Sequence, residues 1–235
     1  MSAPAARGPI VTIDGPAAVG KTTVGRMLAE SLGYLCLDSG LFYRAVALAT
    51  VRADGDPDRA DDALAAARSL RLRFAADPSG KFAARTFDGD CEISEALVSP
   101  EVDRTVSLVS RIPEVRAAML EPQREALREG GIVALGRDIG TVVCPEADLK
   151  VYLDASPDVR AKRRWKERRD AGGEMDIADI RENLLARDRI DSQRSIAPLR
   201  AASDAVIIST DACAPTEVVE AIRASMTERG LIHAA

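Results

Sequence analysis

The sequence predicts an α/β fold in which a parallel sheet of about five strands is flanked by helices. Short apolar runs alternate with segments of helical periodicity near both ends of the chain, and this alternation is typical of parallel sheets. The run Gly131–Leu135 is apolar throughout, as expected for a strand whose two faces are both covered. The 235 residues, 46% hydrophobic and 29% charged, allow one large domain or a core with a modest insertion, and they exclude a disordered or disulfide-dependent chain.

The core elements are predicted in two groups. At the start of the chain, strand and helix follow each other twice, over Ile10–Ile13, Thr22–Leu32, Tyr34–Leu37 and Leu41–Val51. Towards the end, three strands and a helix are predicted over Gly131–Leu135, Leu149–Leu153, Ala205–Ile208 and Ala214–Glu228. We expect the last helix to pack on the sheet through an apolar stripe that comprises Val218, Val219, Ile222 and Met226.

The middle of the chain has a different pattern and predicts an inserted subdomain. A helix is expected first, then two alternating strand segments around a turn, and then two longer helices. In chain order these elements are Ala60–Ser69, Leu70–Ala76, the turn Asp77–Gly80, Phe82–Phe87, Glu92–Ser110 and Pro113–Arg128. The predicted organisation is therefore a core of residues 8–55 and 129–235 that carries an insertion of residues 56–128.

Charge and cysteine content limit the partners. The net charge of −5 argues against a nucleic-acid polymer as ligand. The sequence has neither a signal-peptide pattern nor an apolar run of about 18 residues, so we expect no membrane contact and a cytoplasmic location. The four cysteines lie far apart and His233 is the single histidine, so we expect no metal cluster and buried, reduced thiols at Cys36, Cys91, Cys144 and Cys213. No pattern indicates an obligate assembly, and a monomer is predicted.

The strongest motif is a phosphate-binding loop (P-loop). Gly15–Thr22 matches the pattern GxxxxGK[ST] and lies between a predicted strand and a predicted helix, which is the context that this motif requires. Its glycines let backbone N–H groups surround phosphate oxygens, Lys21 can bridge the β- and γ-phosphates, and the Thr22 hydroxyl can bind Mg²⁺. The expected ATP-binding residues are Gly15, Pro16, Ala17, Ala18, Val19, Gly20, Lys21, Thr22 and Thr23. The alternative is an accidental glycine-rich turn.

Arginines follow several predicted strands and indicate the kind of acceptor. The sequence lacks the base-reading and switch segments of a GTPase, which favours a phosphotransferase. A phosphate acceptor is already a nucleophilic anion and needs cations around it, and Arg44, Arg137, Arg187 and Arg194 are placed to supply them. Two alternatives stay open: a kinase for a hydroxyl group, with Asp138 or Asp191 as the base, and a nucleotide-gated binding module without catalysis. Any single one of these arginines can instead form an ion pair with a carboxylate at the surface.

Five segments, in this order and spacing, resemble the bacterial cytidylate kinases, which belong to the P-loop nucleoside monophosphate kinases. They are Gly15–Thr22, Asp38–Arg44, Gly136–Thr141, Arg160–Arg164 and Arg187–Arg194. The resemblance covers nearly the whole chain. It implies transfer of the ATP γ-phosphate to CMP or dCMP, with Mg²⁺ as the metal. Residues 56–128 are similar to the family's monophosphate-binding subdomain, and residues 156–173 are similar to its lid.

The resemblance also implies roles for individual residues. Arg44, Arg137 and Arg187 would hold phosphates. Ser39, Asp191 and Arg194 would hold the sugar, and Ser107, Arg116 and Asp138 would contact cytosine. In the lid, seven of the ten residues 160–169 are basic, a composition that otherwise indicates a solvated helix face. The implied catalytic set is Lys21, Arg137, Arg160, Arg163, Arg164 and Arg187.

The sequence departs from the family pattern in two places. Leu135 stands where many relatives carry an aspartate that contributes to the outer shell of the metal. The segment Glu95–Pro100 lacks an arginine usually found in the monophosphate-binding subdomain. The acceptor site would then depend on Arg104, Arg111 or Arg116.

Overall fold

The computed structural model describes residues 7–80, 83–170, 172, 176–194 and 196–233. The chain forms two compact units. Unit 1 is built around Leu35–Ile132, and unit 2 around Pro9–Tyr34 and Val133–Ala235. The first unit thus takes in residues 35–55 as well as the predicted insertion, whose role in binding a monophosphate stays a prediction.

The main sheet has five strands in the order β2-β6-β1-β7-β8, which confirms the predicted α/β class. Its strands are β2 (Leu35–Asp38), β6 (Ile132–Gly136), β1 (Ile10–Asp14), β7 (Leu149–Asp154) and β8 (Val206–Ser209). β1 pairs in parallel with β7, and β7 pairs in parallel with β8. Every residue of β1 and β6 is buried, because the interior strands of such a sheet are covered on both faces.

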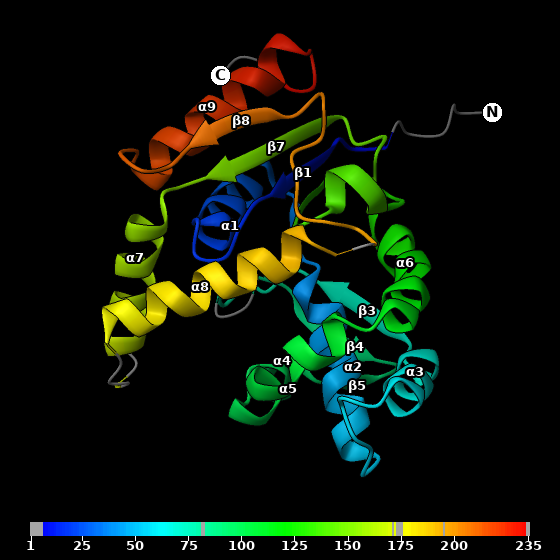
Figure 1. Ribbon diagram of the computed structural model, residues 1–235. Helices are drawn as coiled ribbons and strands as arrows, with labels where there is room; N and C mark the ends of the chain where they lie inside the picture. The colour runs from blue at the N-terminus through cyan, green and yellow to red at the C-terminus, as the bar shows by residue number, and fades with distance from the viewer. Residues whose placement is uncertain (1–6, 81–82, 171, 173–175, 195, 234–235) are drawn as a thin grey trace, which may run out of the picture. The chain divides into compact units, whose positions relative to one another are not determined.

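Two helices of unit 2 pack against each other and cover apolar residues of the core. They are α1 (Lys21–Leu32) and α9 (Pro215–Glu228), shown in blue and orange-red in Figure 1. The four residues of the predicted apolar stripe of α9 are all buried. α1 ends at Gly33, whose φ of 67° allows the chain to leave the helix in the left-handed conformation that glycine adopts without strain.

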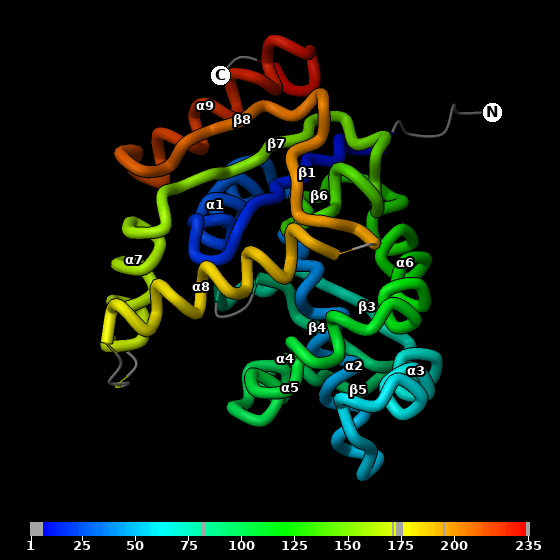
Figure 2. Tube along the Cα trace, viewed as in Figure 1, coloured from blue at the N-terminus to red at the C-terminus, as the bar shows by residue number. Residues whose placement is uncertain are grey.

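A long excursion leads from β7 to β8 and contains two packed helices, α7 (Pro157–Asp170) and α8 (Ile177–Ser192) (Figure 2). Ala161 of α7 and Ile180 and Leu184 of α8 form a small apolar cluster with Ala17 of the P-loop. The basic run is therefore not only a solvated face, because one side of α7 is buried. Residues 171 and 173 of the predicted lid lie outside the described residues.

Unit 1 combines helices with a small antiparallel sheet of order β3-β4-β5. Its core includes the ring of Phe42, which lies 4.8 Å from that of Phe74. The elements are α2 (Gly40–Arg52), α3 (Ala60–Ser69), β3 (Leu72–Ala75), β4 (Arg85–Asp88), β5 (Cys91–Glu92), α4 (Ser94–Leu97), α5 (Pro100–Ser110) and α6 (Pro113–Leu127).

Two expectations about local structure are wrong, one about a helix and one about the cysteines. The single helix predicted over Glu92–Ser110 is divided into β5, α4 and α5, because Ser99 is extended and caps a new helix that begins at Pro100. The loop after β6 contains a π-helix over Ile139–Val143. Two cysteines, Cys91 and Cys213, are exposed, whereas Cys36 and Cys144 are buried, and all four are free thiols.

Among the residues that the structure describes, no helix is both long enough and apolar enough to cross a membrane.

Candidate active site

The P-loop connects β1 to α1 and presents backbone donors at the start of a helix. Within the described structure, the N–H groups of Ala17, Ala18, Val19 and Gly20 donate to no protein acceptor. Gly20 has a φ of 99°, and a Cβ on this residue would meet no atom within 4 Å, so the space beside Gly20 is open. Unsatisfied N–H groups at a helix N-terminus bind anions, and this part of the loop therefore suits a phosphate chain.

Gly15 is required by the close packing at the opposite end of the loop. Its φ is 148°, and a Cβ there would lie 2.2 Å from the carbonyl oxygen of Leu153 in β7. Any other residue would push the loop away from the sheet. The first glycine of the motif thus allows close contact with β7, whereas Gly20 provides the turn into α1.

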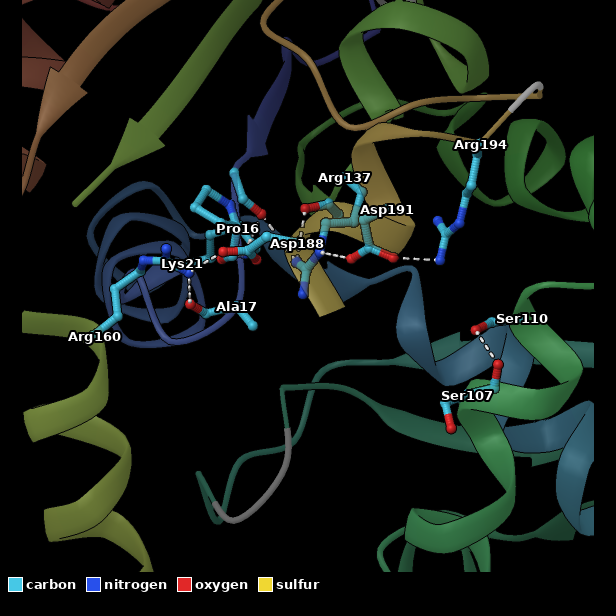
Figure 3. Close-up of polar contacts among 12 residues, drawn as sticks. Pro16, Ala17, Lys21, Ser107, Ser110, Arg137, Arg160, Asp188, Asp191 and Arg194 are labelled. Carbon is cyan, nitrogen blue, oxygen red and sulfur yellow. Dashed lines mark hydrogen bonds and ion pairs between the residues drawn. The ribbon is translucent and has the colours of Figure 1, made fainter. Parts of the chain in front are cut away.

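Lys21 folds back onto the loop that precedes it. Its Nζ donates to the carbonyl oxygens of Gly15, at 2.7 Å, and Pro16, at 2.6 Å (Figure 3). The ammonium group is thus already held at the mouth of the loop. Bound phosphate oxygens can replace these carbonyl acceptors without a large displacement of the chain.

Three arginines also donate to carbonyl groups of the P-loop. Arg137 Nη1 lies 3.0 Å from the oxygen of Gly15. Arg160 Nη1 and Arg163 Nη1 each lie 3.3 Å from a loop oxygen, those of Ala17 and Val19 respectively. The latter two guanidinium groups, predicted to act at the transferring phosphoryl group, contact the loop backbone in this structure.

A second set of arginines surrounds Asp191, whose side chain is only 4% exposed. Arg137 Nε lies 3.1 Å from one of its oxygens, and Arg194 Nη2 lies 2.5 Å from the other (Figure 3). Burial lowers the pKa of Arg187, and the positive charges of Arg137, Arg164 and Arg194 lower it further, while Asp191 opposes them. The positive charges of three other arginines thus act on Arg187, and the negative charge of Asp191 opposes them, an arrangement that favours a polyanionic ligand.

Arg160 pairs with a different carboxylate, that of Asp188. Its Nη1 lies 2.6 Å from Asp188 Oδ2, and its Nε donates to the oxygen of Ala155 at 3.0 Å. The Arg160 side chain is 5% exposed. Asp188 Oδ1 is also buried and accepts no hydrogen bond from the described residues.

Asp14, at the end of β1, is a buried carboxylate that the sequence analysis did not single out. It accepts hydrogen bonds from the N–H groups of Ile139 and Gly140, at 3.0 and 2.8 Å, in the first turn of the π-helix. Burial raises its pKa to about 6, and the negative charge of Asp138 adds to the increase, while these hydrogen bonds and Lys21 oppose it. The polar residue at the end of a buried strand, directly before the P-loop, was the available signal.

The residues around Thr22 fit a magnesium ion that is bound mainly through ligand oxygens. Thr22 is exposed at the first turn of α1, so its hydroxyl is accessible. No group of three His, Cys, Asp or Glu side chains among the described residues can hold a metal ion. Mg²⁺ typically keeps waters and substrate phosphates as ligands and takes few ligands from the protein, and this site matches that chemistry.

Leu135 is packed into the core, where it cannot contact a metal. Its side chain is 1% exposed. A Cβ on Gly25 of α1 would lie 2.5 Å from Leu135 Cδ2, so the leucine occupies the space that the glycine leaves free. The leucine side chain is thus accommodated by a glycine on the facing helix.

Unit 1 holds the remaining predicted contacts. Arg44 Nη1 donates to the carbonyl oxygen of Leu97 at 2.8 Å, and its Nη2 lies 2.7 Å from Asp103 Oδ1. Ser39 precedes α2 but makes no capping hydrogen bond, and the neighbouring carboxylate of Asp38 accepts from the N–H of Gly40 instead. Arg111, named as a possible substitute for the missing arginine, forms an ion pair with Asp58.

Arg116 lies against an aromatic ring, and this contact was not predicted. Its guanidinium carbon is 5.1 Å from the centre of the Tyr43 ring, and the arginine is 8% exposed. Its Nη1 approaches the oxygen of Ser110 at 3.4 Å, and the Ser110 hydroxyl donates to the oxygen of Ser107 at 3.4 Å. Ser110, whose contact with Ser107 is drawn in Figure 3, therefore connects two residues predicted to contact cytosine. The third such residue, Asp138, belongs to unit 2.

Comparisons with known proteins agree with this arrangement of motifs. Residues 11–228 match the family model described as cytidylate kinase. A cytidylate kinase of Desulfitobacterium hafniense (strain Y51) is 39% identical over 212 residues, which cover 90% of each chain. A cytidylate kinase of Methylococcus capsulatus (strain ATCC 33009 / NCIMB 11132 / Bath) is 45% identical over 214 residues, which cover 90% of this chain and 94% of its own.

A solved structure shares the fold at low identity. It is an uncharacterized protein from Eubacterium ventriosum ATCC 27560, which is 11% identical, has a TM-score of 0.54 and covers 94% of this chain and 99% of its own. The family match spans almost the whole chain and contains both the P-loop and the arginine-rich segments described above. The chain belongs to the cytidylate kinase family.

Proposed function

We propose that the protein transfers the γ-phosphate of ATP to CMP or dCMP and releases ADP with CDP or dCDP. The observation that carries this proposal is the set of cations in unit 2: Lys21 at the P-loop, with Arg137, Arg187 and Arg194 in the same unit. Two phosphate chains repel each other, and such cations offset that repulsion while the phosphoryl group moves. Membership of the cytidylate kinase family supports the choice of base.

The state of Asp191 favours a phosphate acceptor over a hydroxyl acceptor. A general base must have an oxygen that can take a proton from the acceptor. Each oxygen of Asp191 is instead paired with a guanidinium group, one from Arg137 and one from Arg194. A monophosphate needs no base, because it arrives as an anion.

The proposed mechanism is positional and electrostatic. The N–H groups of the P-loop bind the donor phosphates, Lys21 moves from its carbonyl acceptors to phosphate oxygens, and the arginines hold the acceptor phosphate in line. Mg²⁺, when bound at Thr22, neutralises charge on the donor phosphates. Ser39 and Arg44 would hold the sugar and phosphate of the acceptor. Ser107, Arg116 and Asp138 would read cytosine, whose N4 amino group donates and whose N3 and O2 atoms accept.

A coupled assay of ADP formation tests the proposal. The full chain is supplied with ATP, Mg²⁺ and one acceptor at a time: CMP, dCMP, UMP, AMP or shikimate. We expect turnover with CMP and dCMP, and we expect chromatography to identify the diphosphate product. Turnover with shikimate alone would establish a hydroxyl kinase. Tight ATP binding without any turnover would establish a nucleotide-gated binding module, the alternative that the replacement at Leu135 keeps open. Sedimentation of the same sample tests the predicted monomer.

A further inference from the structure

The P-loop is contacted on two sides by different groups. Its N–H groups from Ala17 to Gly20 have no acceptor within the described protein, whereas its carbonyl groups at Gly15, Pro16, Ala17 and Val19 accept from side chains. A peptide unit that turns its N–H towards a ligand turns its carbonyl group away from it. The donors on the carbonyl side therefore determine how the N–H groups are aimed.

We propose that Arg160 and Arg163 are positioning residues that hold the carbonyl side of the P-loop and so aim its N–H groups at the triphosphate of ATP. The sequence analysis placed both arginines at the transferring phosphoryl group. The inference depends on the proposed function in one respect only, namely that ATP is the phosphate donor.

Arg160 is held by three acceptors through its Nε and Nη1 atoms. It donates to Ala155, to Ala17 of the loop and to Asp188 of α8. Its side chain is almost completely buried, and Asp188 contacts no other donor among the described residues through its second oxygen. To reach a phosphate, the arginine would leave that carboxylate as an uncompensated buried charge, which is costly.

Arg163 supports the next carbonyl of the loop through a small network. It donates to the oxygen of Val19, and its Nη1 also lies 2.9 Å from Thr210 Oγ1. Its Nη2 lies 2.5 Å from the carbonyl oxygen of Thr210. The Thr210 hydroxyl donates to the same Val19 oxygen at 3.1 Å. An arginine and an uncharged residue thus act on one carbonyl group, and this allows charge and positioning to be separated.

Ala18 shows why the loop needs support. It adopts a φ of 58°, a left-handed conformation that costs a residue with a Cβ free energy. The peptide unit before Ala18 carries the carbonyl group that Arg160 binds, and the carbonyl group that Arg163 binds belongs to the next residue, Val19. Without these donors, the loop can relax from the conformation that presents four N–H groups together.

Binding titrations with the full chain and Mg²⁺ test the proposal, using ATP and inorganic tripolyphosphate as ligands. We expect Arg160→Met and Arg163→Met each to lower the affinity for both ligands by about 10-fold to 100-fold, because hydrogen bonds from charged groups to the loop are lost. Arg181→Met is the matched control, because Arg181 also joins α8 to α7, through Asp158, but contacts no loop carbonyl. We expect it to change affinity less than twofold. Weakening of ATP alone would show that the arginines contact the nucleoside and would overturn the proposal.

Thr210→Val keeps the volume of the side chain and removes no charge. If the Val19 carbonyl is held as proposed, this variant should lower the affinity for tripolyphosphate by about threefold to tenfold. Unchanged affinity would contradict the proposal that donors to the loop carbonyls aim its N–H groups. Arg160→Lys keeps the charge beside Asp188, so it folds even if Arg160→Met does not, and we expect an intermediate loss of affinity.

The steady-state constants make a further distinction. Positioning of the loop should raise KM for ATP and leave kcat within about threefold, because the N–H groups act equally before and during transfer. A 100-fold fall in kcat with unchanged affinity would show contact with the moving phosphoryl group and overturn the proposal. The titrations contain no acceptor, so they remain decisive even if CMP is not phosphorylated.

Discussion

The arginines of the two units have different surroundings. In unit 2, Arg137 is held by the buried carboxylate of Asp191 and Arg160 by the half-buried carboxylate of Asp188, and both donate to backbone carbonyl groups of the P-loop. In unit 1, Arg44 pairs with Asp103, whose side chain is 58% exposed, and Arg116 rests on the Tyr43 ring. Removal of a buried partner leaves an uncompensated charge, whereas exposed pairs contribute little. The comparison therefore predicts tightly constrained arginines in unit 2 and more adaptable arginines in unit 1.

The largest effect is expected for Lys21→Met in unit 2. The lysine is the P-loop cation nearest to the donor phosphates, and its loss should lower kcat/KM by about 1000-fold, in line with other groups that stabilise transferring phosphates. Thermal unfolding should change little, because the two carbonyl groups to which Lys21 donates belong to its own loop. A coupled ADP assay provides the measurement. Turnover at the wild-type rate would disprove the assignment of the donor site.

The next effect concerns Asp14 and stability. Its pKa of about 6 lies above the unfolded value of 3.8, so the folded chain holds the proton more tightly. Asp14 therefore favours folding at low pH, and this contribution is lost as the pH rises through 6. The free energy of unfolding of the wild type relative to Asp14→Asn should fall by about 2–3 kcal/mol between pH 4 and pH 7. Denaturant titrations at both pH values measure it, and a constant difference would show an ordinary carboxylate.

A pair of matched variants tests the comparison directly. Asp191→Asn removes the charge that pairs with Arg137 and Arg194, and we expect kcat/KM for CMP to fall about 30-fold. Asp103→Asn removes the exposed partner of Arg44, and we expect a change below threefold. Equal losses in the two variants would show that burial does not distinguish the units.

The smallest effect is expected at Tyr43, the ring beneath Arg116. Tyr43→Leu should raise KM for CMP by about fivefold with little change in kcat, since a cation–π contact contributes about 1 kcal/mol. Tyr43→Phe keeps the ring and should remain within twofold. If Tyr43→Phe is as poor as Tyr43→Leu, the hydroxyl that accepts from Gln123 matters more than the ring.

Some features could be predicted because they depend on neighbours in the sequence. The order of strands and helices in unit 2 follows from apolar periodicity, and the P-loop follows from a continuous motif at a strand end. The break before Pro100 could also have been read from the sequence, since serine followed by proline is a common helix start. The β5 strand has only two residues, too few for a period to be visible.

The sequence by itself determined the α/β class, the P-loop and the positions of the arginines along the chain. Each of these can be read from periodicity, motif spacing or residue identity. Only the tertiary structure decided the acceptor of each guanidinium group. Arg160 and Arg163 are separated by more than 140 residues from the carbonyl groups that they contact. Burial in the folded chain likewise raises the pKa of Asp14. The physical reason is that desolvation and long-range hydrogen bonding depend on which segments are packed together, and the residue types alone do not specify this.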